Sequence, residues 1–214
     1  VVSLAICFYF VWALPPSKHF VARPLQFKPL VKSLFHHLRD STLVCLFAIG
    51  FLLMGSFVTM YNYISFKFLE EPYALSATIV GWIFLVYLVG TFSSAWFGSL
   101  SSKYGKQPVL YLGIIIFLAG LLLTIPGPLF MQIIGLVIFT FGFFAAHSVA
   151  SGWVSARATY DKAQASSIYL FAYYLGSSVA GTSGGYFWMK YGWSGIVGFL
   201  GCGISLCLCC AMYI

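Results

Sequence analysis

The chain has 214 residues, of which 61% are hydrophobic, 20% are aromatic and only 7% are charged, and its mean hydropathy is +0.97. A soluble domain is about a quarter charged, so a soluble globule of this size could not cover so much apolar surface. The net charge of +7 does not indicate a nucleic-acid partner, because the basic residues are spread among short loops between apolar runs. We therefore predict a polytopic protein embedded in a lipid bilayer.

The first 41 residues divide into two segments. Residues 1–14 are apolar but too short to cross a bilayer at about 1.5 Å per residue, so we interpret them as the end of a truncated transmembrane helix. Residues 15–41 form a linker, and prolines oppose a continuous helix at its start. A short amphipathic helix on the cytoplasmic membrane surface is expected later in the linker, because four apolar residues share one helical face: Val31, Leu34, Phe35 and Leu38.

Residues 42–214 are dominated by continuous apolar runs of about 20 residues, the length of a transmembrane helix. A membrane barrel would instead show segments of about ten residues with alternating polarity. Asp40 and Ser41 are suitable N-caps for the first run. The expected fold is an all-α membrane protein with a six-helix bundle, and its spans are 42–64, 76–99, 108–126, 129–152, 165–189 and 193–214.

The basic residues predict the orientation of these spans. Nine of the eleven Lys and Arg residues lie in the linker and in the loops after the second and fourth spans. By the positive-inside rule these loops lie in the cytoplasm. Lys67 and Lys190 fall on the opposite side. The multi-pass chain therefore has its linker and its C-terminus in the cytoplasm.

The sequence also contains an internal repeat. The triplet Lys-Tyr-Gly occurs at 103–105 and again at 190–192, an offset of 87 residues. The same offset superimposes two ladders of small residues, which let helix backbones approach closely in a membrane. We expect two three-helix units, 42–126 and 129–214, the second inverted relative to the first because three is odd. The ladder residues assigned to gating or helix packing are Gly90, Ser94, Gly98, Gly181 and Gly185.

One loop carries a family resemblance. Residues 98–107, GSLSSKYGKQ, resemble the signature loop of the major facilitator superfamily, G-x-x-x-D-[RK]-x-G-[RK]-[RK]. Ser102 stands where the family has its aspartate, and Gln107 stands where it has a second base. The matching residues are Gly98, Lys103, Gly105 and Lys106.

Two longer stretches, GFFAAHSVASGW at 142–153 and QASSIYLFAYYLGSSVAGTSGGYFW at 164–188, resemble the YnfM-type bacterial inner-membrane transport proteins. The resemblance covers the chain from the end of helix six through helix twelve. It implies half of a twelve-helix major facilitator fold, an N-terminal six-helix half of the same chain as partner, and a small-molecule solute between the halves. It also implies location in the bacterial inner membrane and efflux, with no cofactor.

In the family, the first and second helices of each triplet line the cavity. On this basis the candidate cavity residues are Ser56, Thr59, Asn62, Tyr87, Thr91, Thr140, His147, Tyr173, Tyr174 and Ser177. Packing between helices would suit the same polar side chains equally well. His147 lies about 7–8 Å from the cytoplasmic end of its span, so it could handle substrate or protons, bond across helices, or gate the cytoplasmic mouth.

The chain has four carboxylates, and all of them lie in loops: Asp40, Glu70, Glu71 and Asp161. The spacing of the cysteines does not match a metal-binding pattern. His147 and Ser151 are four residues apart, but no acid orients the histidine and no nucleophile elbow is present, so an enzyme is not expected. We predict a secondary transporter of a neutral or amphipathic solute, with proton coupling left open. A channel-like or structural subunit acting as a homodimer is the alternative.

Overall fold

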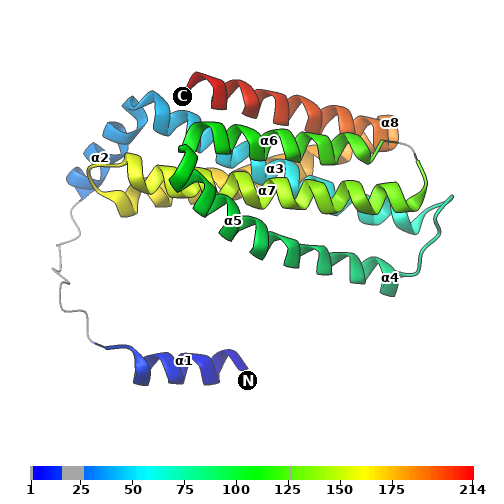
Figure 1. Cartoon of the computed structure of the whole chain (residues 1–214), viewed down its shortest axis with the longest axis horizontal. Helices are drawn as coiled ribbons and strands as arrows, with labels where there is room; N and C mark the ends of the chain where they lie inside the picture. The colour runs from blue at the N-terminus through cyan, green and yellow to red at the C-terminus, as the bar shows by residue number, and fades with distance from the viewer. Residues whose placement is uncertain (1, 16–26, 126) are drawn as a thin grey trace. The chain divides into compact units, whose positions relative to one another are not determined.

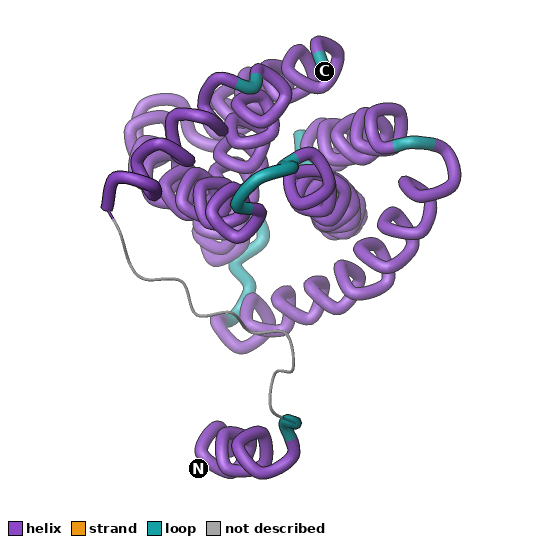
Figure 2. The backbone as a smooth tube through the Cα atoms, turned by 90° about the vertical axis from the view of Figure 1, so that its left-hand side faces the viewer, coloured by secondary structure: helices purple, strands orange, loops and turns teal. Residues whose placement is uncertain are grey.

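The computed structural model describes residues 2–15, 27–125 and 127–214, and these residues form helices and connecting loops without a strand (Figures 1 and 2). The chain divides into one unit that extends to Val31 and a second that begins at Lys32. The first unit contains the apolar helix α1, Val2–Ala13. The proline-rich start of the linker at 16–26 lies outside the described residues. That α1 is the end of a longer span stays a prediction.

The second unit is the helical bundle. Five of its helical runs are long and apolar enough to cross a membrane, which confirms the all-helical membrane fold. The second of these runs consists of α4, a 3₁₀ segment and α5. In chain order the helices are α2 (Phe27–Arg39, which begins in the first unit), α3 (Ser41–Leu69), α4 (Ala77–Trp82), η1 (Ile83–Tyr87), α5 (Leu88–Tyr104), α6 (Lys106–Leu123), α7 (Leu129–Arg157) and α8 (Lys162–Tyr213).

Helix α8 contains 52 residues but is bent, because Gly192 adopts the non-helical angles φ 60° and ψ −144°. The rings of Phe187 and Phe199 stack with their centroids 4.5 Å apart. In a straight helix these residues would be separated by about 18 Å along the axis, so the chain turns sharply between them. α8 therefore consists of two arms, 162–191 and 193–213. The bend falls between the two spans that the sequence predicts at 165–189 and 193–214.

The two copies of the Lys-Tyr-Gly triplet share local geometry. Each ends in a glycine with positive φ, 91° at Gly105 and 60° at Gly192, and these are the two positive-φ glycines of the described residues. In each copy the Lys Nζ lies close to the neighbouring Tyr ring, at 5.1 Å for Lys103 and 5.2 Å for Lys190. A positive φ favours glycine, which has no Cβ. The third position of the triplet thus turns the chain from one helix into the next at both sites.

Close backbone contacts hold the bundle together. α7 packs against α3, α5 and α6, and α8 packs against α3, α6 and α7 (Figure 1). On the α3–α8 seam, a Cβ added to Gly176 would collide with the Phe51 carbonyl oxygen. On the α6–α7 seam, a Cβ added to Gly142 would collide with the backbone of Phe117. The glycines are therefore needed where the backbones approach.

The predicted ladder on the first arm of α8 is displaced by one residue. The tight contacts of the first arm of α8 lie at 176, 180 and 184, where a Cβ on Gly184 would stand 2.6 Å from the Tyr63 ring. At Gly181 the corresponding distance is an ordinary 3.5 Å, to Asn62. Gly185 has an intermediate contact, 3.2 Å from the Tyr63 hydroxyl. The prediction that Gly181 provides the close approach is therefore wrong, because one residue rotates a helix face by about 100°.

The first ladder is also only partly in place. Gly90 is buried, and a Cβ there would collide with the ring of Phe144 on α7. Ser94 is half-buried, whereas its neighbour Ser93 is buried and donates a hydrogen bond of 2.6 Å to the Phe141 carbonyl. A Cβ on Gly98 would meet no described atom within 4 Å. Close packing of the second span thus occurs at Gly90 and Ser93, and not at Gly98.

The seam can be tested with two alanine variants on the same arm. Gly176→Ala is expected to lower the melting temperature in detergent, because its new methyl overlaps the Phe51 carbonyl and overpacking costs about 1–3 kcal/mol. Gly181→Ala is the matched control and should be neutral or slightly stabilising, since alanine favours the helix and has room. Equal melting temperatures for the two variants would contradict the close contact between Gly176 and α3.

Candidate functional site

The candidate site begins with a cluster of aromatic side chains centred on Phe57 of α3. Its ring stacks on Phe143 of α7 with centroids 3.9 Å apart, and it lies 5.3 Å from the ring of Tyr87. Tyr61, one turn after Phe57, meets the ring of Tyr87 at 4.7 Å in an edge-on geometry. Offset and edge-on ring pairs are favourable geometries for aromatic contacts. The cluster therefore joins α3, α7 and the 3₁₀ segment η1.

A hydrogen bond fixes one side of this cluster. The Tyr61 hydroxyl lies 2.7 Å from the Thr140 Oγ1, and both residues are buried. Thr140 donates its single hydroxyl hydrogen to the Leu136 carbonyl at 2.8 Å. Tyr61 must then be the donor to Thr140. The pair satisfies both hydroxyls inside an apolar interior, where an unpaired group would be costly.

A second cluster surrounds His147. Its Nδ1 lies 2.9 Å from the hydroxyl of the buried Tyr169, and its ring lies 4.7 Å from Tyr173. The ring of Phe143 stacks parallel to the imidazole at 5.8 Å and so connects the two clusters. Tyr174 contacts Tyr173 edge-on at 5.3 Å and is itself 60% exposed. His147 is thus held across helices α7 and α8 by a hydrogen bond and by rings.

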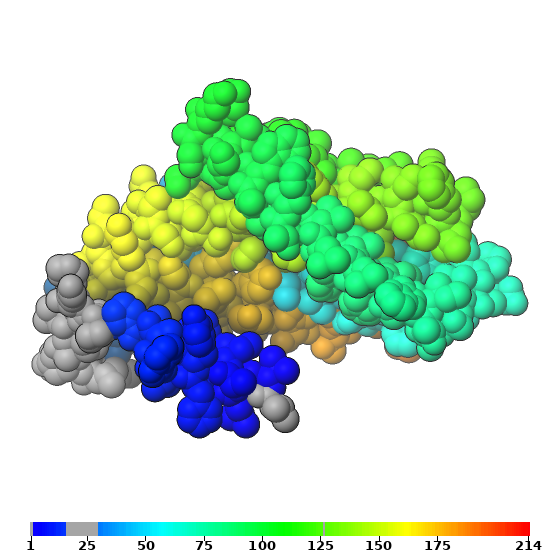
Figure 3. All heavy atoms as spheres, turned by 60° about the horizontal axis from the view of Figure 1, so that its bottom comes forward, coloured from blue at the N-terminus to red at the C-terminus, as the bar shows by residue number. Residues whose placement is uncertain are grey.

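The clusters open onto one face of the bundle. Figure 3 shows α5 lying alongside α7 on this side, with part of α3 visible between α5 and the first arm of α8. Tyr87 of η1 is 37% exposed, and Tyr174 of α8 is exposed. A 3₁₀ segment inside a long helix often marks a hinge or a sequence under strain. We call this surface, formed by Tyr87 and Tyr174 beside the rings of the two clusters, the aromatic face. It combines buried rings with two rings that a solute could reach.

Five of the predicted cavity residues come together here: Tyr87, Thr140, His147, Tyr173 and Tyr174. Ser177 is adjacent, and its hydroxyl donates to the Tyr174 carbonyl at 2.8 Å. Thr91 is exposed on α5. Thr91 therefore stays a prediction.

Three predicted residues on α3 face α8 instead. Thr59 is buried, bonds to the Gly55 carbonyl at 2.7 Å and packs at Gly184. Asn62 lies beside Gly181, and Ser56 is close to the second arm of α8. Ser56, Thr59 and Asn62 therefore lie apart from the aromatic clusters, and their place in a solute cavity stays a prediction. The face of α3 that meets α7 is occupied by Phe57 and Tyr61.

Phe57, Tyr61, Phe143 and Tyr169 are essential members of the clusters that the sequence did not reveal as site residues. One signal was present, because aromatic and imidazole rings recur at four-residue spacing in three helices. Such spacing places rings on one helix face. In an apolar chain it does not show whether that face meets protein or lipid.

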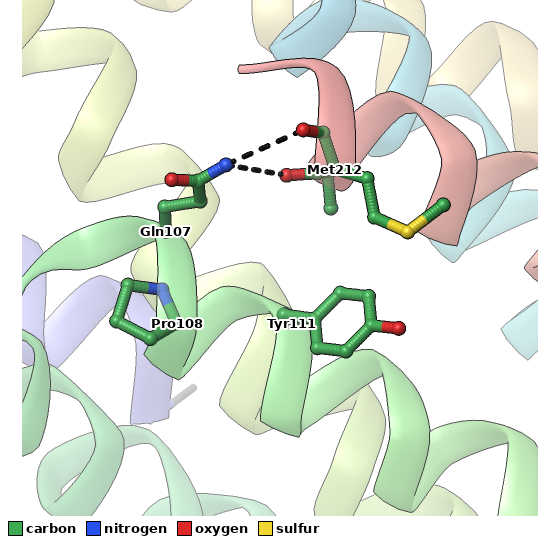
Figure 4. Close-up of a pocket in the computed structure, with 5 residues that line it drawn as sticks. Gln107, Pro108, Tyr111 and Met212 are labelled. Carbon is green, nitrogen blue, oxygen red and sulfur yellow. Dashed lines mark hydrogen bonds between the residues drawn. The ribbon is translucent and has the colours of Figure 1, made fainter.

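The signature loop connects α5 and α6. Ser102, which replaces the family's aspartate, donates its hydroxyl to the Gly98 carbonyl of the same helix at 3.3 Å. Figure 4 shows Gln107 reaching the end of α8, where its Nε2 donates to the carbonyl oxygens of Ala211 at 3.3 Å and Met212 at 3.5 Å. Neutral hydrogen bonds therefore serve at the positions where the family motif carries an acid and a base.

A cationic network occupies the opposite end. Lys67 of α3 donates to the Thr124 carbonyl at 3.2 Å and to Gln132 Oε1 at 2.8 Å. Its Nζ also lies 4.4 Å from the centre of the Trp193 ring, whose Nε1 donates to the same Thr124 carbonyl at 2.7 Å. Carbonyl oxygens and an aromatic face thus stabilise this ammonium group. The network joins α3, the α6–α7 loop, α7 and the second arm of α8.

The linker meets the bundle at Asp40. Its Oδ1 accepts hydrogen bonds from the backbone N–H groups of Thr42 and Leu43, at 3.0 and 3.3 Å, and so caps α3 as predicted. Its Oδ2 accepts from Arg157 Nε at 2.8 Å, which ties α3 to the end of α7. Desolvation raises the pKa of Asp40, but the bonds from Arg157 and the backbone outweigh it, so this pKa lies below the usual 3.8.

Helix α2 precedes this cap and has an unusual distribution of polarity. Ser33 and His37 are buried and lie 3.4 Å apart, whereas Phe35 and Leu38 are exposed. The ring of His36 contacts Tyr160 edge-on, with centroids 6.1 Å apart. Exposed apolar residues on a helix with a buried polar face suit a membrane surface. The interfacial location of α2 stays a prediction.

All four carboxylates lie at helix ends or in loops: Asp40 and Asp161 at N-caps, Glu70 at a C-cap, and Glu71 in the following turn. Within the described residues, no group of three or more His, Cys, Asp or Glu could hold a metal ion. The fold and the site define a polytopic helical membrane protein with an aromatic interior free of carboxylates.

The chain belongs to the major facilitator superfamily, whose model matches residues 46–214, and it is thus related to transporters and not to enzymes. It is 50% identical over 200 residues to the uncharacterized MFS-type transporter YybF of Bacillus subtilis, covering 94% of this chain and 50% of that protein. It is 46% identical over 198 residues to the inner membrane transport protein YnfM of Escherichia coli, covering 92% and 48%. The chain spans about half the length of these relatives.

Asp40 provides a pH-dependent test of the linker contact. A carboxyl with a depressed pKa stabilises the fold above its unfolded pKa and loses this contribution as the pH falls through its lower, folded value. The melting temperature should therefore fall below about pH 4 in the unmodified protein more steeply than in Asp40→Asn. Asparagine retains an N-cap, so Asp40→Ala should be less stable than Asp40→Asn at pH 7, by about 1 kcal/mol. Identical pH profiles for the unmodified protein and Asp40→Asn would refute the role of the charge.

Proposed function

We propose that this chain forms the C-terminal half of a secondary transporter of the bacterial inner membrane, which exports a small neutral or amphipathic solute by alternating access. The observation that carries this proposal is the aromatic face, where the exposed rings of Tyr87 and Tyr174 adjoin the buried rings of Phe57, Tyr61, Phe143 and Tyr169 and the half-buried His147 and Tyr173. Transporter sites lie where two halves meet and combine apolar walls with a few polar groups. Inner-membrane location is supported by the relationship to YnfM.

The chemistry of this face supports a neutral or amphipathic solute. Rings supply apolar area, and the hydroxyls of Tyr87, Tyr173 and Tyr174 supply hydrogen bonds. The carboxylates lie at helix ends or in loops, away from the clusters, so a cationic solute would find no counter-charge on this half. Transfer of an unpaired charge out of water is strongly unfavourable. A solute with modest polarity would bind at lower cost.

We also propose the inverted-repeat arrangement. It is supported by the two triplets, whose glycines both have positive φ and whose lysines lie at nearly equal distances from the next ring. The packing supports it as well: α3 contacts both arms of α8, while α7 contacts α5 and α6. Each unit's first helix thus packs on the other unit's later helices. The linker and the C-terminus are assigned to the cytoplasm by the distribution of basic residues.

Solute recognition can be tested in the native full-length protein reconstituted into vesicles. A panel of labelled neutral, amphipathic, cationic and anionic compounds is screened first for uptake. Tyr87→Ala and Tyr174→Ala should each lower transport of the accepted compound about 2- to 10-fold, since one ring contact contributes about 0.5–1.5 kcal/mol. Phe130→Ala, which removes an exposed ring at the start of α7, is the control. An equal loss of transport in all three variants would show that the aromatic face is not the solute site.

If transport is coupled to protons, His147 is the candidate carrier of this half, because its imidazole lies within the bundle, away from the four carboxylates. His147→Gln can still hydrogen-bond to Tyr169 but cannot take up a proton. We expect this variant to retain solute exchange at equal pH while losing accumulation driven by a pH gradient. Ser148→Ala, one residue along α7, is the control. Gradient-driven accumulation by His147→Gln would place the coupling group elsewhere.

A further inference from the structure

A separate cavity lies between α3 and both arms of α8, away from the aromatic face. Its volume is about 320 Å³, at the lower end of the range of about 300–1,000 Å³ for small-molecule sites. The walls are mainly apolar and include Phe199, while Val179 and Leu206 are 47% and 56% exposed at its edge. The cavity is therefore accessible from the surface of the described bundle.

The cavity lies near the middle of the helices that form it. Ser56 is in the centre of α3, Ser41–Leu69, and Gly203 is in the centre of the second arm of α8, 193–213. A transmembrane helix centred in a bilayer places its middle residues in the hydrocarbon region. The molecules that reach this cavity from outside the protein must therefore be soluble in hydrocarbon.

Two serine hydroxyls line this cavity, those of Ser56 and Ser183, and Ser56 is the buried one. Ser56 is 4% exposed and lines the cavity, but its hydroxyl makes no hydrogen bond within the described residues. Other α3 hydroxyls bond to their own helix, as Thr59 does to the Gly55 carbonyl and Ser65 to the Tyr61 carbonyl. Ser56 Oγ is not among the fully enclosed unpaired atoms of the described residues, so it is open to the cavity, and a molecule bound there could pair with it.

Glycine keeps the space opposite this hydroxyl open. A Cβ on Gly203 would stand 3.5 Å from Ser56 Oγ and 3.9 Å from Leu52. Both are ordinary contacts, so the backbone does not require glycine at this position. The missing side chain leaves cavity volume directly beside Ser56. This differs from Gly176, where a Cβ would collide with the Phe51 carbonyl.

We propose that this cavity binds a small, largely apolar molecule that dissolves in the membrane and carries one hydrogen-bonding group, as a medium-chain alcohol does. The apolar walls would cover the chain, and Ser56 would pair with the polar group. A lipid acyl tail fits less well, because it has no polar atom at this depth. The site is distinct from the aromatic face and does not depend on the proposed transport function.

The probe is octanol carrying a diazirine, added to the native full-length protein in phospholipid vesicles and cross-linked by light. We expect saturable labelling that maps by mass spectrometry to the segments 51–56 and 199–206, which contribute to the cavity. Octanol should compete about 2- to 10-fold better than octane at equal mole fraction in the bilayer, because only octanol can bond to Ser56.

Matched variants distinguish labelling in the cavity from labelling of the rest of the surface. Gly203→Leu should abolish saturable labelling by filling the cavity, and Gly203→Ala, whose methyl has room, should weaken it. Gly198→Leu on the same arm should have no effect, since a Cβ there meets no described atom within 4 Å. Ser56→Ala should remove the preference for octanol over octane.

Three results would overturn the proposal. Non-saturable labelling spread over the surface would mean simple partitioning. Equal competition by octane, unchanged by Ser56→Ala, would mean that the cavity accepts a lipid tail. Absence of labelling in the full-length protein would mean that another part of it covers the cavity. None of these measurements monitors transport, so their failure would leave the proposed function untouched.

Discussion

The close approach of helix backbones is the constraint on which the rest of this structure depends. In a bilayer, lipid tails are as apolar as leucine, so helices associate through tight packing and not through burial from water. The glycines at 55, 142, 176 and 184 make that packing possible, because each would place a Cβ under 3.0 Å from the neighbouring helix. This packing holds the rings of Phe57, Phe143 and Tyr173 in one continuous set of contacts.

Hydropathy was sufficient to predict the helices and the class of protein, and the repeated triplet marked the turns at Gly105 and Gly192. The rotation of each helix about its axis could not be predicted. A soluble helix shows its inward face by polarity, but a membrane helix is apolar towards both protein and lipid. The close contacts at Ala180 and Gly184 therefore lie one residue before the predicted ladder positions Gly181 and Gly185.

The interior polar groups follow a common rule, which Ser56 breaks. Tyr61 pairs with Thr140, and His147 pairs with Tyr169, so the two buried tyrosine hydroxyls of the clusters each have a partner. The exposed part of the clusters consists instead of the rings and hydroxyls of Tyr87 and Tyr174. For the proposed transporter, this arrangement favours broad recognition of a solute by shape and area over recognition of a particular charge.

The attachment of helix α2 to the bundle has a mechanical consequence. A single residue separates it from α3, and contacts from His36 to Tyr160 and from Asp40 to Arg157 attach it to the end of α7 and to the loop after it. If the bundle tilts during a transport cycle, α2 must tilt with it and move the exposed side chains of Phe35 and Leu38 relative to the lipid headgroups. The free-energy difference between inward- and outward-open states would then include a lipid contribution, set by bilayer thickness and lateral tension.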